Sequence, residues 1–163
     1  MQINPYNFLE NKKYQLEGDI DFSSTDLSAI FNLKKINNCH VNIDINNYEN
    51  VLVLSIKINT NVTLVSSYSL KEFDKDLSIN DTIDFSFNEE DENSSFVIKD
   101  SNLILDKYIL DIIITNIPSK VAMKGEKLPV GDESFRVISE DEYLKEKENQ
   151  KDDRWSKLDD IDL

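Results

Sequence analysis

The chain has 163 residues, of which 32 are acidic and 18 are basic, so its formal net charge is −14 and its pI is near 4.4. This charge repels polyanions, and the longest basic runs, Lys12-Lys13 and Lys34-Lys35, are too short to neutralise a nucleic-acid backbone. Only 3 Gly and 3 Pro are present, which excludes collagen-like and linker-rich classes. We therefore expect a folded protein whose partners are basic proteins and not naked RNA.

The sole cysteine, Cys39, excludes an internal disulfide and indicates a reducing compartment. The first residues lack a basic segment followed by an apolar run, and nowhere do about 18 apolar residues run together. The sequence thus predicts a cytoplasmic protein with no membrane partner.

Two strands and a short helix are predicted in the first 45 residues. Residues 14–22 alternate loosely between apolar and polar, which indicates a short strand. The residues of 23–26 offer N-cap oxygens ahead of apolar side chains in 27–33, and this pattern predicts a short helix. Residues 39–45 place Val, Ile and Ile on one side and polar residues on the other, as in a half-buried strand.

The middle of the chain predicts further strands. A polar run at 46–50 precedes the alternating segment 51–58, so a hairpin is expected. Asn59-Thr60-Asn61 gives another turn signal before the next strand, residues 73–79 extend or re-enter the sheet, and residues 82–87 alternate again. Strands spaced this closely leave no room for crossover helices, so antiparallel pairing is expected.

Segment 103–120 follows an acidic loop at 88–93 and a predicted strand at 94–99. Its Ile-rich composition favours a strand, whereas apolar residues recurring every three or four positions favour a helix. Asp106 near the start and a proline beyond the end favour a helix over 106–117, buried on one stripe. The predicted core includes Leu52, Leu54, Ile56, Ile83, Phe85, Ile109, Ile112 and Ile113.

The last part of the chain is polar and acidic. A loop at 120–133 and a short edge strand at 135–138 precede the capping box of Ser139–Glu142, which predicts the start of a helix without an apolar stripe. The expected fold class is α+β, with a curved or barrel-like antiparallel β-sheet of about six or seven strands and flanking helices. We expect a single domain over 1–138 and an acidic helical C-terminal tail over 139–163.

The tail contains DDRWSKLDDI, residues 152–161, which holds the only tryptophan. Three apolar side chains spaced three apart form one face of a short hook. They either pack back onto the domain or present an aromatic anchor to a partner, because Trp and Arg are enriched in binding hot spots. Composition favours packing, and the two roles are compatible. The candidate partner-binding residues are Asp153, Arg154, Trp155, Leu158 and Ile161.

No catalytic constellation is visible in the sequence. Cys39 and His40 are adjacent on a predicted strand and point to opposite faces, so they form no nucleophile–base pair, and four zinc ligands of these types are not available. The many carboxylates fit a solvated surface, and no phosphate-binding glycine motif occurs. We predict that the chain is not an enzyme and uses no cofactor, metal or small-molecule substrate.

Three stretches of the chain carry a family likeness by their order and spacing. They are VTLVSSYSLKEFDKDLSI at 62–79, LILDKYILDIIITNIPSK at 103–120, and FRVISEDEY at 135–143 followed by DDRWSKLDDI. Together they resemble the bacterial YceD-type proteins, a large ribosomal RNA subunit accumulation family, in its Firmicute/Mollicute-like branch. The chain departs from that pattern at Ser66, Tyr68 and Asp153, where the family commonly has Cys, Arg and Pro, and it lacks the family's cysteine cluster.

This resemblance implies a non-catalytic role in 23S rRNA accumulation and large ribosomal subunit assembly, without a metal site. The charge of the chain adds that its partner is a basic ribosomal protein or a protein-rich face of a pre-50S particle. The alternative is a generic acidic protein-interaction adaptor unrelated to the ribosome. A carboxylate-dependent hydrolase is a third class, which single acidic substitutions would test.

Overall fold

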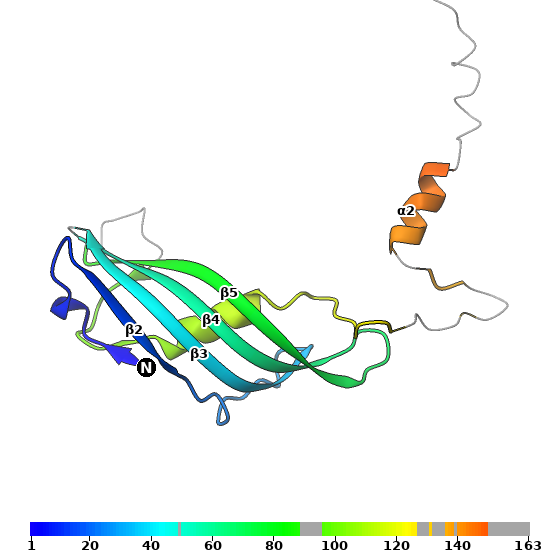
Figure 1. Cartoon of the computed structure of the whole chain (residues 1–163), viewed down its shortest axis with the longest axis horizontal. Coiled ribbons are helices and arrows are strands. Elements are labelled where there is room, and N and C mark those ends of the chain that lie inside the picture. The colour runs from blue at the N-terminus through cyan, green and yellow to red at the C-terminus, as the bar shows by residue number, and fades with distance from the viewer. Residues whose placement is uncertain (49, 89–95, 127–130, 132–135, 139, 150–163) are drawn as a thin grey trace, which may run out of the picture. The chain divides into compact units, whose positions relative to one another are not determined.

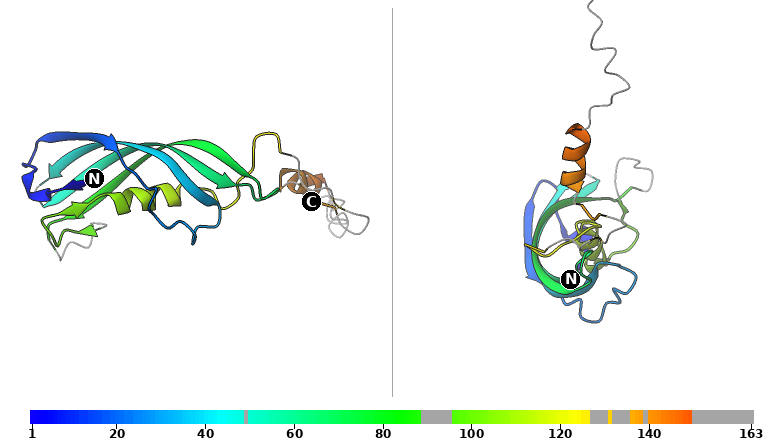
Figure 2. Two further views of the ribbon diagram at one scale, coloured as in Figure 1. Left: turned by 90° about the horizontal axis from the view of Figure 1, so that it is seen from below. Right: turned by 90° about the vertical axis from the view of Figure 1, so that its right-hand side faces the viewer.

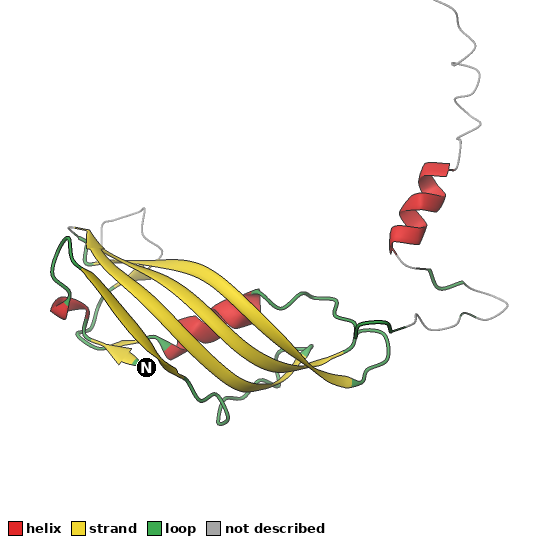
Figure 3. Ribbon diagram, viewed as in Figure 1, coloured by secondary structure: helices red, strands yellow, loops and turns green. Residues whose placement is uncertain are grey.

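The computed structural model describes residues 1–48, 50–88, 96–126, 131, 136–138 and 140–149. The chain divides into two units, Met1–Met123 and Lys124–Leu163. The domain boundary predicted between residues 138 and 139 stays a prediction. Figure 1 shows the course of the chain, and Figure 3 shows that strands are the main regular structure of the first unit.

A five-stranded sheet dominates the first unit, in the order β2-β3-β4-β5-β6. The first four strands pair antiparallel, whereas β6 pairs with β5 in parallel. A separate two-stranded sheet joins β1 and β7. The strands are β1 (Gln2–Ile3), β2 (Lys13–Asp19), β3 (Leu33–Tyr48), β4 (Val51–Val65), β5 (Glu72–Ser86), β6 (Phe96–Val97) and β7 (Leu103–Ile104).

The main sheet curls around α1 (Asp106–Thr115), as the end-on view in Figure 2 shows. Strands β2 and β6 do not pair with each other, so the sheet is curved and open. The α+β class is therefore confirmed, while the described strands close no barrel. The parallel β6 corrects the expectation of a purely antiparallel sheet, and the sheet has five strands where six or seven were expected.

The inner face of the sheet and α1 form the core. Alternate residues of β3 and β4 are fully buried because a strand turns every second side chain to the same face. All eight predicted core residues are buried, which confirms that prediction. The ring of Tyr108 packs edge-on against Phe85 at 5.0 Å and against Phe96 at 4.9 Å, between ring centroids.

The helix predicted in 106–117 is confirmed as α1. Ile109 and Ile113 are fully buried, so one stripe faces the sheet. The N-terminal ammonium of Met1 bonds to the carboxylate of Asp106 in the first turn, where a negative charge also suits the helix dipole. The backbone N–H of Asn116 donates to carbonyls of the last turn and ends the helix.

The short helix predicted in 23–33 is wrong, because this segment forms successive turns. The carboxylates of Asp21 and Asp26 accept hydrogen bonds from the backbone N–H groups of Ser23 and Ser28, at 2.8 and 3.0 Å. These bonds hold the pKa values of both carboxyl groups below their usual range. Local side-chain bonds of this kind compete with helix formation, and in this segment they replace the helix.

A one-turn 3-10 helix, Pro5–Asn7, lies earlier in the chain.

The turn predicted at Asn59–Asn61 is also wrong, because β4 runs through it without a break. The Oγ1 of Thr60 donates to the carbonyl of Asn38 at 2.5 Å, and the Oγ of Ser78 donates to Oδ1 of Asn59 at 3.0 Å. Cross-strand partners therefore replace the local bonds that make these residue types favour turns. In the same way, the segments predicted at 73–79 and 82–87 form one strand, β5.

The second unit contains α2 (Glu140–Asn149), in the segment where the capping box predicts a helix. Arg136–Ile138 form no strand, so the edge strand predicted at 135–138 is wrong over these residues. Arg136 Nη1 pairs with Glu146 Oε1 at 2.8 Å. The capping residue Ser139 lies outside the described residues. So do the hook residues Asp153, Arg154, Trp155, Leu158 and Ile161. Within the described part of the chain, no helix has the length and apolar character needed to cross a membrane.

Candidate functional site

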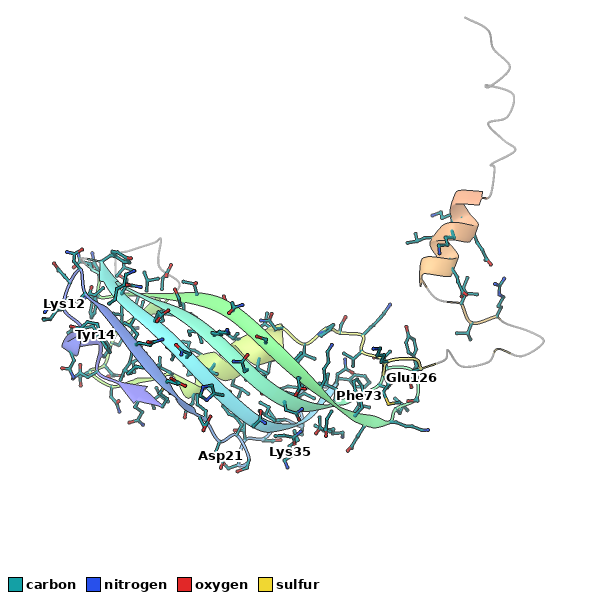
Figure 4. The ribbon with its side chains drawn as sticks, in the orientation of Figure 1. Lys12, Tyr14, Asp21, Lys35, Phe73 and Glu126 are labelled. Atoms are coloured by element: carbon teal, nitrogen blue, oxygen red, sulfur yellow. The ribbon has the colours of Figure 1, made fainter. Side chains whose placement is uncertain are left out.

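The outer face of the main sheet is the largest polar surface that the strands build together. It consists of the side chains of β2 to β5 that alternate with the buried ones, and the register aligns them in rows such as Asn42, Lys57 and Asn80. Figure 4 shows this face toward the viewer, with Lys35 and Phe73 labelled near the starts of β3 and β5. The outer face comprises Gln15, Glu17, Asp19, His40, Asn42, Asp44, Asn46, Val53, Ser55, Lys57, Asn59, Asn61, Thr63, Asp74, Asp76, Ser78, Asn80, Thr82 and Asp84.

This face is strongly acidic. Together with the residues at its strand ends it carries seven carboxylates against three lysines and His40. The carboxylates are Glu17, Asp19, Asp44, Glu72, Asp74, Asp76 and Asp84, and the lysines are Lys57 and, at the strand ends, Lys13 and Lys35. Charges gathered on one surface raise the local concentration of oppositely charged ligands and speed their association. The outer face is therefore suited to a cationic partner.

Hydrogen bonds between strands fix many of these side chains. Asn61 lies at the centre of one group: its Oδ1 accepts from Nδ2 of Asn37 at 2.8 Å, and its Nδ2 donates to Oδ1 of Asp76 at 2.6 Å. Beside it, Oγ1 of Thr63 donates to Oδ1 of Asp74 at 2.6 Å. Each bond leaves further acceptor lone pairs of the carboxylate open to solvent. The acceptors are thus already oriented before any partner binds.

His40 joins two of the carboxylates. Its Nδ1 lies 2.7 Å from Oδ1 of Asp19, and its Nε2 lies 3.1 Å from Oε1 of Glu17. Both acceptors are carboxylates, so the imidazolium, with an N–H on each nitrogen, fits the site better than the neutral ring. The hydrogen bond to Asp19 accordingly raises the pKa of His40 above its ordinary value, and the bond to Glu17 acts in the same direction.

Two open hollows lie on the outer face. The first is lined by Asn42, Asp44, Ser55, Ile56, Lys57, Asn80, Asp81 and Thr82, and the second by Asp19, Asn38, His40, Asn59, Thr60, Asp76, Leu77 and Ser78. Most of their lining residues are polar or charged, although apolar atoms of these residues form much of the walls, and both hollows are open to solvent. No group of three or more His, Cys, Asp or Glu among the described residues is arranged to hold a metal ion. The hollows suit polar side chains of a larger partner.

Cys39 and His40 point to opposite faces, as predicted from their adjacency. Cys39 is only 2% exposed in the core, whereas the side chain of His40 is 44% exposed. Burial raises the pKa of the Cys39 thiol to about 11, and the charges of Asp19 and Asp106 act in the same direction. The structure therefore does not bring the thiol and the imidazole together.

Two of the three departures from the resembled family, Ser66 and Tyr68, lie in the loop between β4 and β5, and the third, Asp153, lies outside the described residues. Ser66 is fully buried, and its Oγ accepts hydrogen bonds from the backbone N–H groups of Tyr68 and Ser69 at 3.1 and 3.3 Å. Tyr68 is 42% exposed. Ser66 thus shapes this loop, and Tyr68 lies at the surface.

Sequence reasoning missed the outer face as a site, because the register alone brings carboxylates from β2, β3 and β5 onto one surface. A usable signal was present in β5, where Asp or Asn recurs at alternate positions, as at Asp74, Asp76 and Asp84.

Among known proteins, no family model, curated protein or solved structure matches this chain.

Proposed function

We propose that this chain is a non-catalytic binding protein that holds a basic ribosomal protein, or a basic protein surface of a pre-50S particle, against its outer face. By this route it supports 23S rRNA accumulation and assembly of the large ribosomal subunit in the cytoplasm. The observation that carries the binding role is the outer face, with seven carboxylates against three lysines. The ribosomal assignment rests on the sequence resemblance.

The charge of the whole chain supports a protein partner over RNA. A net charge of −14 opposes approach to phosphates, and the lysines flanking the outer face lie at strand ends and form no continuous track. A basic protein is attracted electrostatically by the acidic chain during association and forms polar contacts with it in the complex. Because the carboxylates are largely exposed, this attraction is screened over about 8 Å at physiological salt, and binding should weaken as salt rises.

The hook residues Asp153, Arg154, Trp155, Leu158 and Ile161 are proposed as a second contact for the same partner. An aromatic residue flanked by acids supplies apolar contact area within an acidic surface. In Trp155→Ala we expect the first unit to stay folded while partner recovery falls. Global unfolding of that variant, seen by circular dichroism, would mean that the hook belongs to the core.

The proposal is tested by recovering the tagged full-length chain from growing cells at moderate salt and identifying what accompanies it. We expect a basic ribosomal protein or a large-subunit precursor, with partial co-migration with precursor particles in a sucrose gradient. Recovery of naked RNA without such a protein would refute the proposal. A non-ribosomal protein partner, with no co-migration, would instead favour the generic adaptor.

A matched pair of variants locates the binding surface. Asp44→Asn/Asp76→Asn removes two carboxylates from the outer face, and Asp100→Asn/Asp111→Asn removes two exposed carboxylates elsewhere. Both variants change the net charge equally. Only the first should lower recovery of the basic partner, by about fivefold or more, since each close charge pair is worth about 0.5–1 kcal/mol. Equal losses in both would mean that overall charge, and not this face, governs binding.

A further inference from the structure

Over most of its length, one edge of the main sheet has no strand of the described residues beside it. β5 pairs with β4 along its whole length, from Glu72 to Ser86, but pairs with β6 only at Phe85 and Ser86. Among the described residues, no other backbone group bonds to the β5 edge over 72–84. We call this stretch the open edge. It exposes a row of N–H and C=O groups that an added strand would satisfy.

The inner side of the open edge is only partly covered. Lys75 and Asp81 pair in register with Val62 and Ile56, which are buried, yet both β5 residues are exposed. Ile79 and Ile83, on the same side of β5, are buried. The core thus reaches the open edge at these two residues and leaves it uncovered at Lys75 and Asp81.

The charge on β5 selects among the possible occupants. Lys75 is its only basic residue, against five acids: Glu72, Asp74, Asp76, Asp81 and Asp84. If a second copy paired edge to edge, these carboxylates would face carboxylates of the same strand, and like charges across a strand pair are destabilising. Charged edge residues of this kind protect sheets from self-association. The same residues attract a strand rich in Lys or Arg.

We propose that the open edge binds an extended, basic segment of the partner as an additional strand. This inference rests on the proposed function for the basic chemistry of the partner. The pleat of β5 specifies the segment further, because its outer positions, such as Asp74 and Asp76, alternate with inner apolar positions, such as Ile79 and Ile83. The complementary segment alternates Lys or Arg with Val, Ile or Leu.

Strand addition already occurs at one end of this edge. Phe96 and Val97 of β6 pair in parallel with Phe85 and Ser86, and the ring of Phe96 lies 5.6 Å from that of Phe85 on the inner side. The backbone N–H of Ile98 then donates to the carbonyl of Ser86 at 2.8 Å. The edge of β5 thus accepts a strand whose aromatic side chain faces inward, and the pairing stops where the open edge begins.

The experiment uses the full-length chain and four 13-residue peptides. One alternates Lys and Val, and one has the same composition in separate Lys and Val blocks. The other two are the alternating peptide with N-methyl groups on every second residue, one for each register. We expect the alternating peptide to bind about tenfold tighter than the block peptide, and at least one N-methylated form to lose that advantage. Affinity is measured by fluorescence anisotropy.

Hydrogen exchange supplies a direct readout of strand addition. Binding of the alternating peptide should slow amide exchange within 72–84, because the N–H groups that point away from β4 gain partners. Exchange in β4, over 51–65, should not change, since its amides are already paired on both sides. Protection of 72–84 that rises with protein concentration alone would overturn the proposal in favour of a second copy.

A matched pair of variants completes the test. Asp74→Lys/Asp76→Lys should weaken the alternating peptide by at least about tenfold, and Asp100→Lys/Asp111→Lys, with the same change in net charge, should not. If alternating, block and N-methylated peptides bind equally and exchange in 72–84 is unchanged, the open-edge proposal is refuted. The acidic outer face would still stand as the binding surface, so the two proposals fail separately.

Discussion

The two faces of the main sheet come from the same strands but carry different constraints. On β4, the inward residues Leu52, Leu54 and Ile58 are fully buried, while the outward Lys57 and Asn59 are exposed. Close packing restricts each inward position in volume and shape. Each outward position is free of that restriction, so the outer face can carry charged and hydrogen-bonding groups without disturbing the packing of the core. The inward residues thereby serve stability, and the proposed binding role falls to the outward ones.

The largest expected effect comes from emptying the inner face beside α1. Phe85 is fully buried against Phe96 and Tyr108, so Phe85→Ala should lower the free energy of unfolding by about 3–5 kcal/mol. Asp84→Ala, on the outer face of the same strand, should change it by about 0.5 kcal/mol or less. Urea denaturation followed by circular dichroism measures both. Similar losses in the two variants would mean that the faces are not energetically distinct.

A buried amide on the inner face should show an intermediate effect. Asn47 is 7% exposed, and its Nδ2 donates to the carbonyl of Phe8 at 2.7 Å, which ties the N-terminal segment to β3. Asn47→Ala should cost about 1–3 kcal/mol, because the carbonyl loses its partner. The neighbouring Asn46→Ala, on the outer face, is the control and should be close to neutral. Equal denaturation midpoints for the two variants would contradict this assignment.

Sequence reasoning succeeded where the alternation of apolar and polar residues is unbroken. The hairpin predicted from residues 39–45 and 51–58 is correct, because each inward position there is apolar and the outward positions, apart from Val51 and Val53, are polar. The helix at 106–117 was also correct, since spacing outweighed the β-branched composition. In both cases a local pattern and the tertiary packing demand the same structure.

The errors arose where distant partners decide the structure. Asn59–Asn61 suggested a turn because their polar side chains bond locally in most contexts, but here they find partners on β3 and β5. The acidic Asp81 at an inward position interrupts the apolar pattern of β5. The sequence therefore suggests separate segments at 73–79 and 82–87 where the structure has one strand. Carboxylates from β2, β3 and β5 meet on the outer face only through the register. No local sequence pattern reports that register.

A smaller effect on the inner face should appear in thiol chemistry. Burial raises the pKa of Cys39 to about 11, so its reactive thiolate is scarce at neutral pH and its sulfur is shielded. Alkylation by iodoacetamide at pH 8 should therefore be slow in the folded protein and should reach completion in about 8 M urea, which unfolds it. Mass spectrometry follows the reaction. Rapid labelling without denaturant would mean that β3 opens readily at this position.

The smallest effect concerns His40, which follows Cys39 but lies on the outer face. Its pKa should exceed 6.5 in the folded chain, because Asp19 and Glu17 accept hydrogen bonds from both ring nitrogens. Any stabilisation of the folded state by these hydrogen bonds is therefore fully present below pH 6.5 and is lost as the pH rises through the pKa of His40 in the folded chain. Solvent exposure keeps that contribution small.

Titration by NMR of the imidazole resonances resolves this shift without relying on stability. Asp19→Asn should move the pKa of His40 down toward 6.5, because it removes the principal hydrogen bond and charge. Asp44→Asn, four residues further along β3 from His40, should leave it nearly unchanged. An unshifted His40 in the unmodified chain would show that these carboxylates are not held in place in solution. The outer face would then offer a cationic partner mobile acceptors and not a prearranged set.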